Sequence, residues 1–276
     1  MRYSLYKRIL NLIIPIKMQL NFKKIGEGKP FIILHGLFGM GDNLQSFSKS
    51  LTTHGYMVYL VDLRNHGQSP HDDLFNYNVM SDDVAELIES EKLFKPIVFG
   101  HSLGGKVAMQ LAISHPHVAS TIIVVDIAPH SYPVHHQKII EALKSIDLQH
   151  TKSRGEAEKE LAVQLKDNST RQFLLKNLYW KNKDELAWRF NLTAIDIQIE
   201  EVGKPTESDF PVSLPVLFIK GEQSDYIDSS KFDEFKKTFT NARLVTIPNA
   251  GHWIHADNPN DLHKAILEFL NDKSEN

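Results

Sequence analysis

The chain has 276 residues, a formal net charge of −3 and no cysteine. Such a length fits one large α/β domain, or a core domain with an insertion, and needs no disulfide or metal to stabilise a core. The lack of cysteine excludes a disulfide scaffold, a cysteine nucleophile and a thiolate metal site. Acidic and basic residues are mixed without a long basic run, so nucleic acid is not an expected partner. No apolar stretch reaches the roughly 20 residues that span a bilayer, so we expect no stable membrane insertion.

The first 17 residues differ in character from the rest of the chain. Basic side chains precede an apolar stretch over residues 9–16, which Asn11 and Pro15 interrupt. A short secretory signal would look similar, but no small-x-small cleavage site follows. We therefore interpret residues 1–17 as an N-terminal extension, either a frayed leader or the product of an upstream start codon, with Met18 as the functional start. The cysteine-free composition fits a reducing compartment, and we expect a cytoplasmic protein.

Several short segments have the pattern of β-strands. Residues 19–25 alternate apolar and polar side chains, which is typical of a half-exposed edge strand. The others are continuous apolar runs rich in Val, Ile and Phe, which indicates strands buried on both faces, as in a parallel sheet. These runs cover residues 31–34, 57–61, 97–99, 122–125, 216–219 and 244–247.

Helical patterns lie between these strands, over residues 44–51, 79–93, 105–113 and 262–270. The alternation predicts an α/β fold with a mostly parallel central sheet and helices on both faces. We assign residues 18–130 and 210–276 to this core.

The alternation breaks between residues 131 and 209, where no convincing buried strand occurs. Amphipathic helical patterns replace it, over residues 136–146, 156–165, 171–178 and 185–192. We interpret residues 131–209 as a helical lid, inserted after the sixth strand and placed over one end of the sheet. Pro205, Pro211 and Pro215 mark the return of the chain to the core.

One motif joins a predicted strand to a predicted helix. Gly100-His-Ser102-Leu-Gly104 has the pattern G-x-S-x-G, directly after the run at 97–99 and before the helix at 105–113. In that context the motif resembles the nucleophile elbow of the α/β-hydrolase fold, whose sharp turn lifts the serine hydroxyl above the sheet. The glycines leave room for neighbouring backbone, and the positive end of the helix favours a developing oxyanion. We therefore predict that Ser102 is the nucleophile of a serine hydrolase.

A glycine-containing loop, His35-Gly36-Leu37-Phe38-Gly39, follows the strand at 31–34. An acyl-transfer enzyme needs two amide donors around the oxyanion. One comes from the residue after the nucleophile, and the other from a loop after an earlier strand. Leu103 and Leu37 occupy these two places, so we predict that their amides form the oxyanion hole.

The base should lie late in the chain, because the α/β-hydrolase fold orders its triad as serine, acid and histidine. His252 lies in a loop between the strand at 244–247 and the last helix, where it can reach the serine. His255 is a second histidine of that loop, and we interpret His263 as a surface residue of the helix. We predict that His252 is the base, and we interpret the early His66 as structural.

The acid has two candidates on chemistry alone. The strand at 216–219 leads to a glycine, and many relatives of this fold place an aspartate three residues after it, where this chain has Ser224. Asp225 is one place further on, and such a shift can point a carboxylate away from the histidine. Asp126 ends the strand at 122–125, at the same edge of the sheet, and could reach the same imidazole. The residues alone leave Asp126 and Asp225 open.

Everything after Met18 resembles the α/β-hydrolase superfamily, with a closer match to YbfF-type bacterial esterases and the mitochondrial relatives that share their pattern. The resemblance rests on HGLFG with Asp42-Asn43, DLRNHGQS, GHSLGGKVAM, VVDIAP, and lid residues 173–175 and 188–192. In that subfamily the acid of the triad comes directly after the first strand that follows the nucleophile. The residue at that place in this chain is Asp126. A serine near the histidine also joins the active site, which matches Ser224. The resemblance therefore favours Asp126 over Asp225, with Ser224 as an accessory residue.

The resemblance also implies a substrate class. It implies hydrolysis of carboxylic esters and acyl-CoA thioesters through an acyl-enzyme, so the expected partner is a small-molecule acyl ester or acyl-CoA. Neither a cofactor nor a metal is expected, because the triad and two amides supply the chemistry. Dehalogenases and epoxide hydrolases share the fold but have aspartate in place of Ser102. A cofactor-free perhydrolase, an acyltransferase or a ligand-sensing protein could have the same residues. These alternatives remain open, and only a measurement of turnover distinguishes an enzyme from a ligand sensor.

Overall fold

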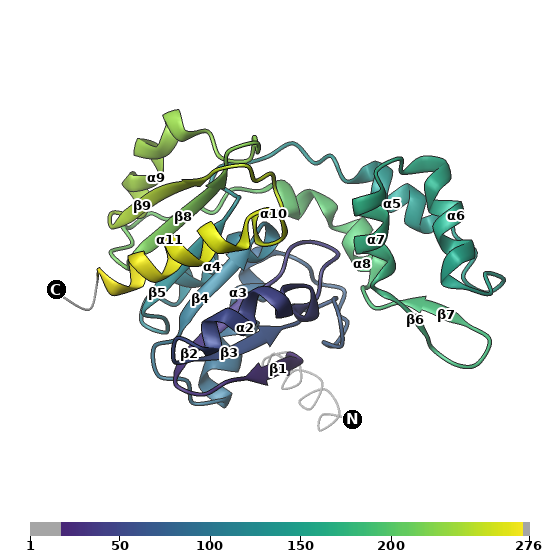
Figure 1. Ribbon diagram of the computed structural model, residues 1–276, viewed down its shortest axis with the longest axis horizontal. Coiled ribbons are helices and arrows are strands. Elements are labelled where there is room, and N and C mark those ends of the chain that lie inside the picture. The colour runs from purple at the N-terminus through teal and green to yellow at the C-terminus, as the bar shows by residue number, and fades with distance from the viewer. Residues whose placement is uncertain (1–17, 273–276) are drawn as a thin grey trace, which may run out of the picture.

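A seven-stranded sheet forms the centre of the computed structural model, which describes residues 18–272 (Figure 1). Its order is β1-β3-β2-β4-β5-β8-β9. Only β1 runs antiparallel to its neighbour, β3, and the remaining pairs are parallel. The strands are β1 (Phe22–Ile25), β2 (Lys29–Leu34), β3 (Tyr56–Val61), β4 (Ile97–His101), β5 (Thr121–Val125), β8 (Val216–Gly221) and β9 (Ala242–Ile247). The predicted mostly parallel sheet is confirmed.

Position in the sheet explains how deeply each strand is buried. The central strands β4 and β5 are buried along their whole length, as continuous Val- and Ile-rich runs predict. The strand β1 forms one edge and is only partly buried, in agreement with its alternating pattern. The run at 244–247 was predicted to be buried on both faces, but residues in the middle of β9 are partly exposed because β9 forms the other edge.

Helices cover both faces of the sheet (Figure 1). The helices α3 (Tyr77–Ser90) and α4 (Leu103–Ser114) contribute to one hydrophobic core, and α2 (Gln45–Thr52) and α11 (Pro259–Asn271) contribute to the other. Alternate residues of β2 point into the two cores, because successive side chains of a strand face opposite sides. The predicted core helices therefore form, and the short helices α9 (Phe232–Thr238) and α10 (Ile254–Asp257) complete this part.

Residues 131–209, called the inserted segment below, form a lobe beside the sheet (Figure 1). Its helices are α5 (Gln137–Lys144), α6 (Arg154–Gln164), α7 (Asn168–Leu175) and α8 (Leu192–Ile197), followed by a 3-10 turn at Ile199–Gly203. The first three overlap predicted helices, and α7 begins and ends three residues before the predicted range of 171–178. The predicted position after the sixth strand was wrong, because within the described residues the segment follows the fifth strand, β5.

A small hairpin replaces one predicted helix of the inserted segment. The strands β6 (Leu178–Trp180) and β7 (Leu186–Trp188) pair antiparallel around a polar turn, where residues 185–192 were predicted to be helical. The prediction was wrong because each strand has only three residues, too few to show alternation. Aromatic residues such as Tyr179 and Trp188 favour strands once a partner is present.

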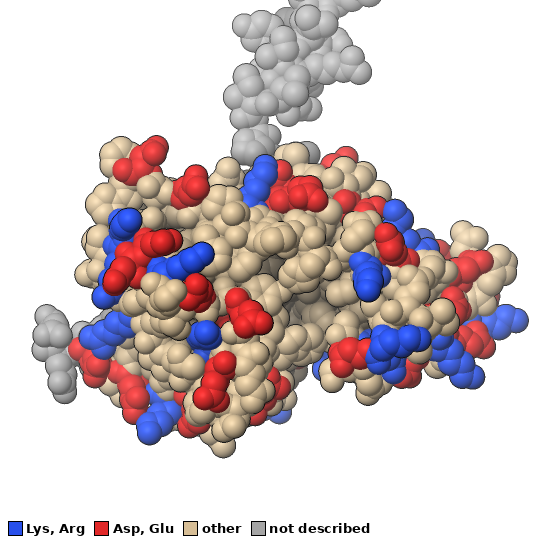
Figure 2. Space-filling model, turned by 90° about the horizontal axis from the view of Figure 1, so that it is seen from above, with Lys and Arg blue, Asp and Glu red and all other residues tan. Residues whose placement is uncertain are grey.

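Charged side chains are interspersed over the molecular face in Figure 2, with both signs close together. Within residues 18–272, no helix is both long and apolar enough to cross a bilayer. The predicted N-terminal extension, residues 1–17, lies outside the part of the chain that the structure describes.

Candidate active site

Ser102 lies in a strained turn between β4 and α4. Its φ of 52° and ψ of −116° fall in a region that non-glycine residues rarely adopt. The Ser102 amide donates a 3.0 Å hydrogen bond to the Val125 carbonyl, which anchors the turn to β5. A Cβ atom on Gly100 would lie 2.0 Å from the Gly104 carbonyl oxygen, so only glycine allows this close approach. The motif therefore builds the sharp turn that its glycines predict.

His252 and Asp126 are joined by a short hydrogen bond. His252 Nδ1 donates to Asp126 Oδ2 over 2.7 Å, and the Asp126 side chain is fully buried. Asp126 Oδ1 accepts a second hydrogen bond, 3.0 Å long, from the Gly221 amide. Asp225, the other candidate acid, is exposed. The structure therefore brings Asp126 to the imidazole.

Ser224 contacts the carboxylate. Its hydroxyl donates to Asp126 Oδ2 over 2.5 Å, so the serine reaches the histidine only through the acid. The loops after β8 and β9 approach closely here, because a Cβ atom on Gly221 would lie 2.3 Å from the Gly251 carbonyl oxygen. This close packing places His252, Ser224 and Asp126 together, although they come from three separate loops.

Two further aromatic side chains hold His252. The Tyr226 ring stacks on the His252 imidazole at a centroid distance of 4.1 Å. His101 Nε2 donates a 2.8 Å hydrogen bond to the His252 backbone carbonyl. Burial, and then the neighbouring His252, lower the pKa of His101 well below its ordinary value, so this imidazole is neutral. Both residues were missed in the sequence, although His101 stands inside the G-x-S-x-G motif.

Two buried histidines shape the loop that carries Leu37. The Phe38 amide donates to His66 Nε2 over 3.1 Å, and the Leu63 amide donates to His35 Nε2 over 3.0 Å. Burial lowers the pKa of His35 to about 4 and that of His66 to about 3, so both rings are neutral and can accept these hydrogen bonds. The structural interpretation of His66 agrees with this contact.

The two predicted oxyanion donors are the Leu37 and Leu103 amides. Leu103 is the first residue of α4, where helical amides have no partner within the helix. Among the backbone hydrogen bonds of the described loops and turns, neither amide donates to a carbonyl. An oxyanion hole requires two such amides without a backbone acceptor, so this arrangement agrees with the prediction.

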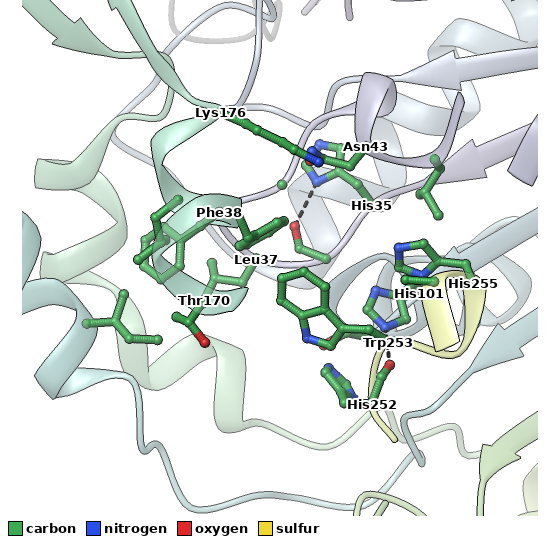
Figure 3. A pocket seen from close by; sticks show the side chains of 18 of the residues that line it. His35, Leu37, Phe38, Asn43, His101, Thr170, Lys176, His252, Trp253 and His255 are labelled. Carbon is green, nitrogen blue, oxygen red and sulfur yellow. Dashed lines mark hydrogen bonds between the residues drawn. The ribbon is translucent and has the colours of Figure 1, made fainter. Parts of the chain in front are cut away.

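A cavity of about 410 Å³ adjoins Ser102 and His252. Figure 3 shows His252, Trp253 and His255 on one side of it and Leu37, Phe38 and Thr170 on the other. The inserted segment lines it with His135, His136, Ile139, Thr170, Phe173, Leu174 and Lys176. Both the core and the inserted segment contribute aliphatic and aromatic side chains to the lining, so the cavity suits an apolar substrate group.

The other late histidines have structural contacts. His255 lines the cavity and packs edge-on against His101, with a pKa that burial lowers to about 4. His263, interpreted as a surface residue, is half-buried: its ring stacks on Phe47 and its Nε2 atom lies 2.7 Å from the Phe47 carbonyl oxygen. Within residues 18–272, no cluster of three or more His, Asp or Glu side chains could hold a metal ion.

Comparison with known proteins gives the family. The family model described as alpha/beta hydrolase fold matches residues 29–259. The chain belongs to the α/β-hydrolase family. Among curated α/β hydrolases, the Danio rerio sn-1-specific diacylglycerol lipase ABHD11 is 38% identical over 252 residues, which cover 89% of this chain and 79% of that protein.

Two further α/β hydrolases are similar over most of their length. Esterase YbfF of Escherichia coli (strain K12) is 32% identical over 247 residues, which cover 89% of this chain and 94% of that protein. A solved structure described as a marine microorganism esterase has 43% identity and a TM-score of 0.88, covering 91% of this chain and 99% of that one. The predicted family and its closeness to YbfF-type esterases are confirmed.

Proposed function

We propose that the protein is a serine hydrolase that cleaves carboxylic esters through an acyl-enzyme. In this proposal Ser102 is the nucleophile, His252 the base and Asp126 the acid. The 2.7 Å hydrogen bond from His252 Nδ1 to the buried Asp126 is the observation that carries it, because that carboxylate can hold the histidine tautomer that a base requires. The names of the relatives, esterase and lipase, support the same reaction class.

The reaction would follow two similar steps. With its Nδ1 proton held by Asp126, His252 accepts the Ser102 hydroxyl proton at Nε2 while the serine oxygen attacks the substrate carbonyl carbon. The Leu37 and Leu103 amides donate hydrogen bonds to the oxyanion. The bond to the leaving group then breaks as His252 returns the proton to it. Water repeats the path on the acyl-enzyme, which releases the acid and restores Ser102.

The proposed substrate is a small-molecule ester with an apolar group, and acyl-CoA thioesters are a second proposed class. The cavity beside Ser102 has Phe38, Phe47 and Phe173 among its lining residues, which suits an acyl chain. We further propose that residues 131–209 act as a lid on the core formed by residues 18–130 and 210–276. The lining residues that come from the inserted segment support this role.

The decisive experiment combines labelling, mutation and a substrate panel. A fluorophosphonate probe should label Ser102, and Ser102→Ala should lose several orders of magnitude in turnover, since only oxyanion and binding contributions remain. Wild-type enzyme should hydrolyse p-nitrophenyl esters, and acyl-CoAs of graded length then test the thioester class. Product analysis with added peroxide or alcohol tests whether water is the preferred acceptor. Labelling elsewhere, or an active Ser102→Ala variant, would overturn the proposal.

A further inference from the structure

Lys106 is a buried lysine with no part in the reaction just proposed. It lies in α4, four residues after Ser102, and only 1% of it is exposed. Its Nζ atom donates to the carbonyl oxygens of Pro129, His130 and Lys204, over 3.0, 2.6 and 3.0 Å. All three acceptors are backbone carbonyls rather than carboxylates. Burying an ammonium group with only neutral acceptors is costly, and burial lowers the pKa of Lys106 to about 7. The three hydrogen bonds compensate the buried amine for the water it has lost.

The three acceptors lie where the inserted segment begins and ends. Pro129 and His130 lie where the chain leaves the sheet, and Lys204 lies near its return. Backbone hydrogen bonds join the same two ends, from Thr206 N to the Pro129 carbonyl and from Tyr132 N to the Gly203 carbonyl, each 2.8 Å long. Lys106 therefore fastens both ends of the inserted segment to the helix that carries the nucleophile.

Tyr132 extends this connection to the acid and the base. Lys106 Nζ lies 5.3 Å from the centre of the Tyr132 ring. The Tyr132 hydroxyl accepts a 2.8 Å hydrogen bond from the Ala128 amide, two residues after Asp126, and donates to the Tyr226 carbonyl. The Tyr226 ring in turn stacks on His252. A continuous set of contacts thus runs from Lys106 to His252 and to the turn that follows Asp126.

We propose that Lys106 and Tyr132 are positioning residues, which hold Asp126 and His252 in the geometry that Ser102 requires and couple that geometry to the ends of the inserted segment. The inference rests on the proposed function for the roles of these three residues. Asp126 has a φ of 52°, a left-handed conformation that an aspartate keeps only when its surroundings restrain it. Lys106 and Tyr132 supply that restraint on the turn that follows Asp126.

The kinetic test uses the full chain and three substitutions in the network. Lys106→Met removes the donors but keeps the apolar stem, Tyr132→Phe removes the bridging hydroxyl, and Lys106→Arg keeps a cationic donor. With p-nitrophenyl acetate, Lys106→Met and Tyr132→Phe should each lower kcat by roughly 10- to 100-fold, since small misplacements of catalytic groups have effects of that size. KM should change less than about twofold, because neither side chain is proposed to bind substrate. Lys106→Arg should recover most of the lost kcat.

Lys204→Gln is the matched control. It removes the exposed ammonium group that pairs with Glu201 but leaves the Lys204 carbonyl in place for Lys106. This variant should keep wild-type kcat. A loss in Lys204→Gln equal to that in Lys106→Met would overturn the proposal, because it would show a general sensitivity of this region to lysine substitution.

A spectroscopic test separates positioning from simple stabilisation. The Nδ1 proton that His252 donates to Asp126 should give a downfield proton resonance, absent in Asp126→Asn. This resonance should shift or broaden in Lys106→Met and Tyr132→Phe and stay unchanged in Lys204→Gln.

If the first two variants fold, keep the resonance and kcat, and only melt at a lower temperature, the positioning role is refuted. If Lys106→Met does not fold, the resonance and kcat of Tyr132→Phe alone decide whether the positioning role holds. Activity in Ser102→Ala would refute the proposed function alone, because the resonance needs only His252 and Asp126.

Discussion

At the scale of single residues, the surroundings of Asp126 set what its carboxylate can do. The group is fully buried and accepts hydrogen bonds from His252, Ser224 and the Gly221 amide. Such donors compensate a buried carboxylate for the hydrogen bonds to water that it has lost. Two of the donors are uncharged and belong to the protein framework. The third is the imidazole that would become positively charged during turnover, which fits a carboxylate that stabilises that charge.

Replacement of this acid should damage chemistry more than folding. In a serine protease, the equivalent Asp→Asn change costs roughly 10⁴ in turnover with intact geometry. We expect Asp126→Asn to approach that loss, while Asp225→Asn, at an exposed position, should change kcat less than about twofold. Ser224→Ala should have an intermediate effect, because its hydroxyl orients the carboxylate but carries no charge. Steady-state kinetics and thermal melts of all three variants provide the measurement. A folded, active Asp126→Asn beside an inactive Asp225→Asn would contradict the assignment.

At the scale of elements, the inserted segment contacts the loops that carry the proposed oxyanion donor Leu37 and the proposed base His252. The Asn177 side-chain amide donates a 2.8 Å hydrogen bond to the Phe38 carbonyl. On the other side, the Phe173 ring packs edge-on against Trp253, the neighbour of His252, at 4.5 Å between centroids. Because these contacts meet both sides of the cavity, side chains of α7 can shape the space for a substrate.

Phe173 is the position where acyl-length preference should respond. Phe173→Ala removes a bulky ring that lines the cavity and is not among the residues proposed to carry the reaction. The kcat/KM ratio of the octanoate to the butyrate p-nitrophenyl ester should rise several-fold, since each newly buried methylene contributes about 0.8 kcal/mol, or about fourfold. Val163→Ala is the control, because Val163 is 72% exposed on α6 and does not line this cavity. An unchanged ratio in Phe173→Ala would speak against a selective role of the lid.

At the scale of the whole molecule, several buried or half-buried histidines should make the fold sensitive to acid. Burial lowers the pKa of His35, His136 and His255 to about 4 and that of His66 to about 3. A histidine with a lowered pKa in the folded state binds protons more readily after unfolding. Its contribution to stability is therefore complete above the unfolded pKa of 6.5 and is lost as the pH falls through the folded value.

The free energy of unfolding should therefore fall between pH 6.5 and pH 4. For His35, a pKa lowered from 6.5 to about 4 corresponds to at most about 3 kcal/mol. Urea unfolding at a series of pH values measures this slope. His66→Gln should flatten the slope, since glutamine keeps an acceptor but does not titrate, whereas the exposed His54→Gln should leave it unchanged. Constant stability from pH 7 to pH 4.5 would show that these rings can be protonated without opening the fold.

Local patterns in the sequence were sufficient for the sheet, the core helices and the turn at Ser102. The periodicity of strands and helices is visible in neighbouring residues, so it can be predicted from the sequence. The predicted strands at 97–99 and 122–125, for example, lie within β4 and β5. The turn requires glycine at positions 100 and 104, where a side chain would clash with backbone atoms, and both glycines can be read directly from the sequence. Chain order within a known fold then indicated Leu37, Leu103 and His252 as further candidates.

Contacts between distant segments were decided only by the tertiary structure. Chemistry alone left Asp126 and Asp225 open, and the family resemblance favoured Asp126 without a physical reason. That reason is how closely the loops after β5, β8 and β9 approach in space. The hairpin of β6 and β7 was missed because its short strands are stable only when paired. The contacts of Lys106 could not be predicted from the sequence either, because its acceptors at Pro129 and Lys204 are 23 and 98 residues away along the chain. Sequence periodicity describes which face of an element is buried, whereas the partners of a buried polar group are set by the packing of whole elements.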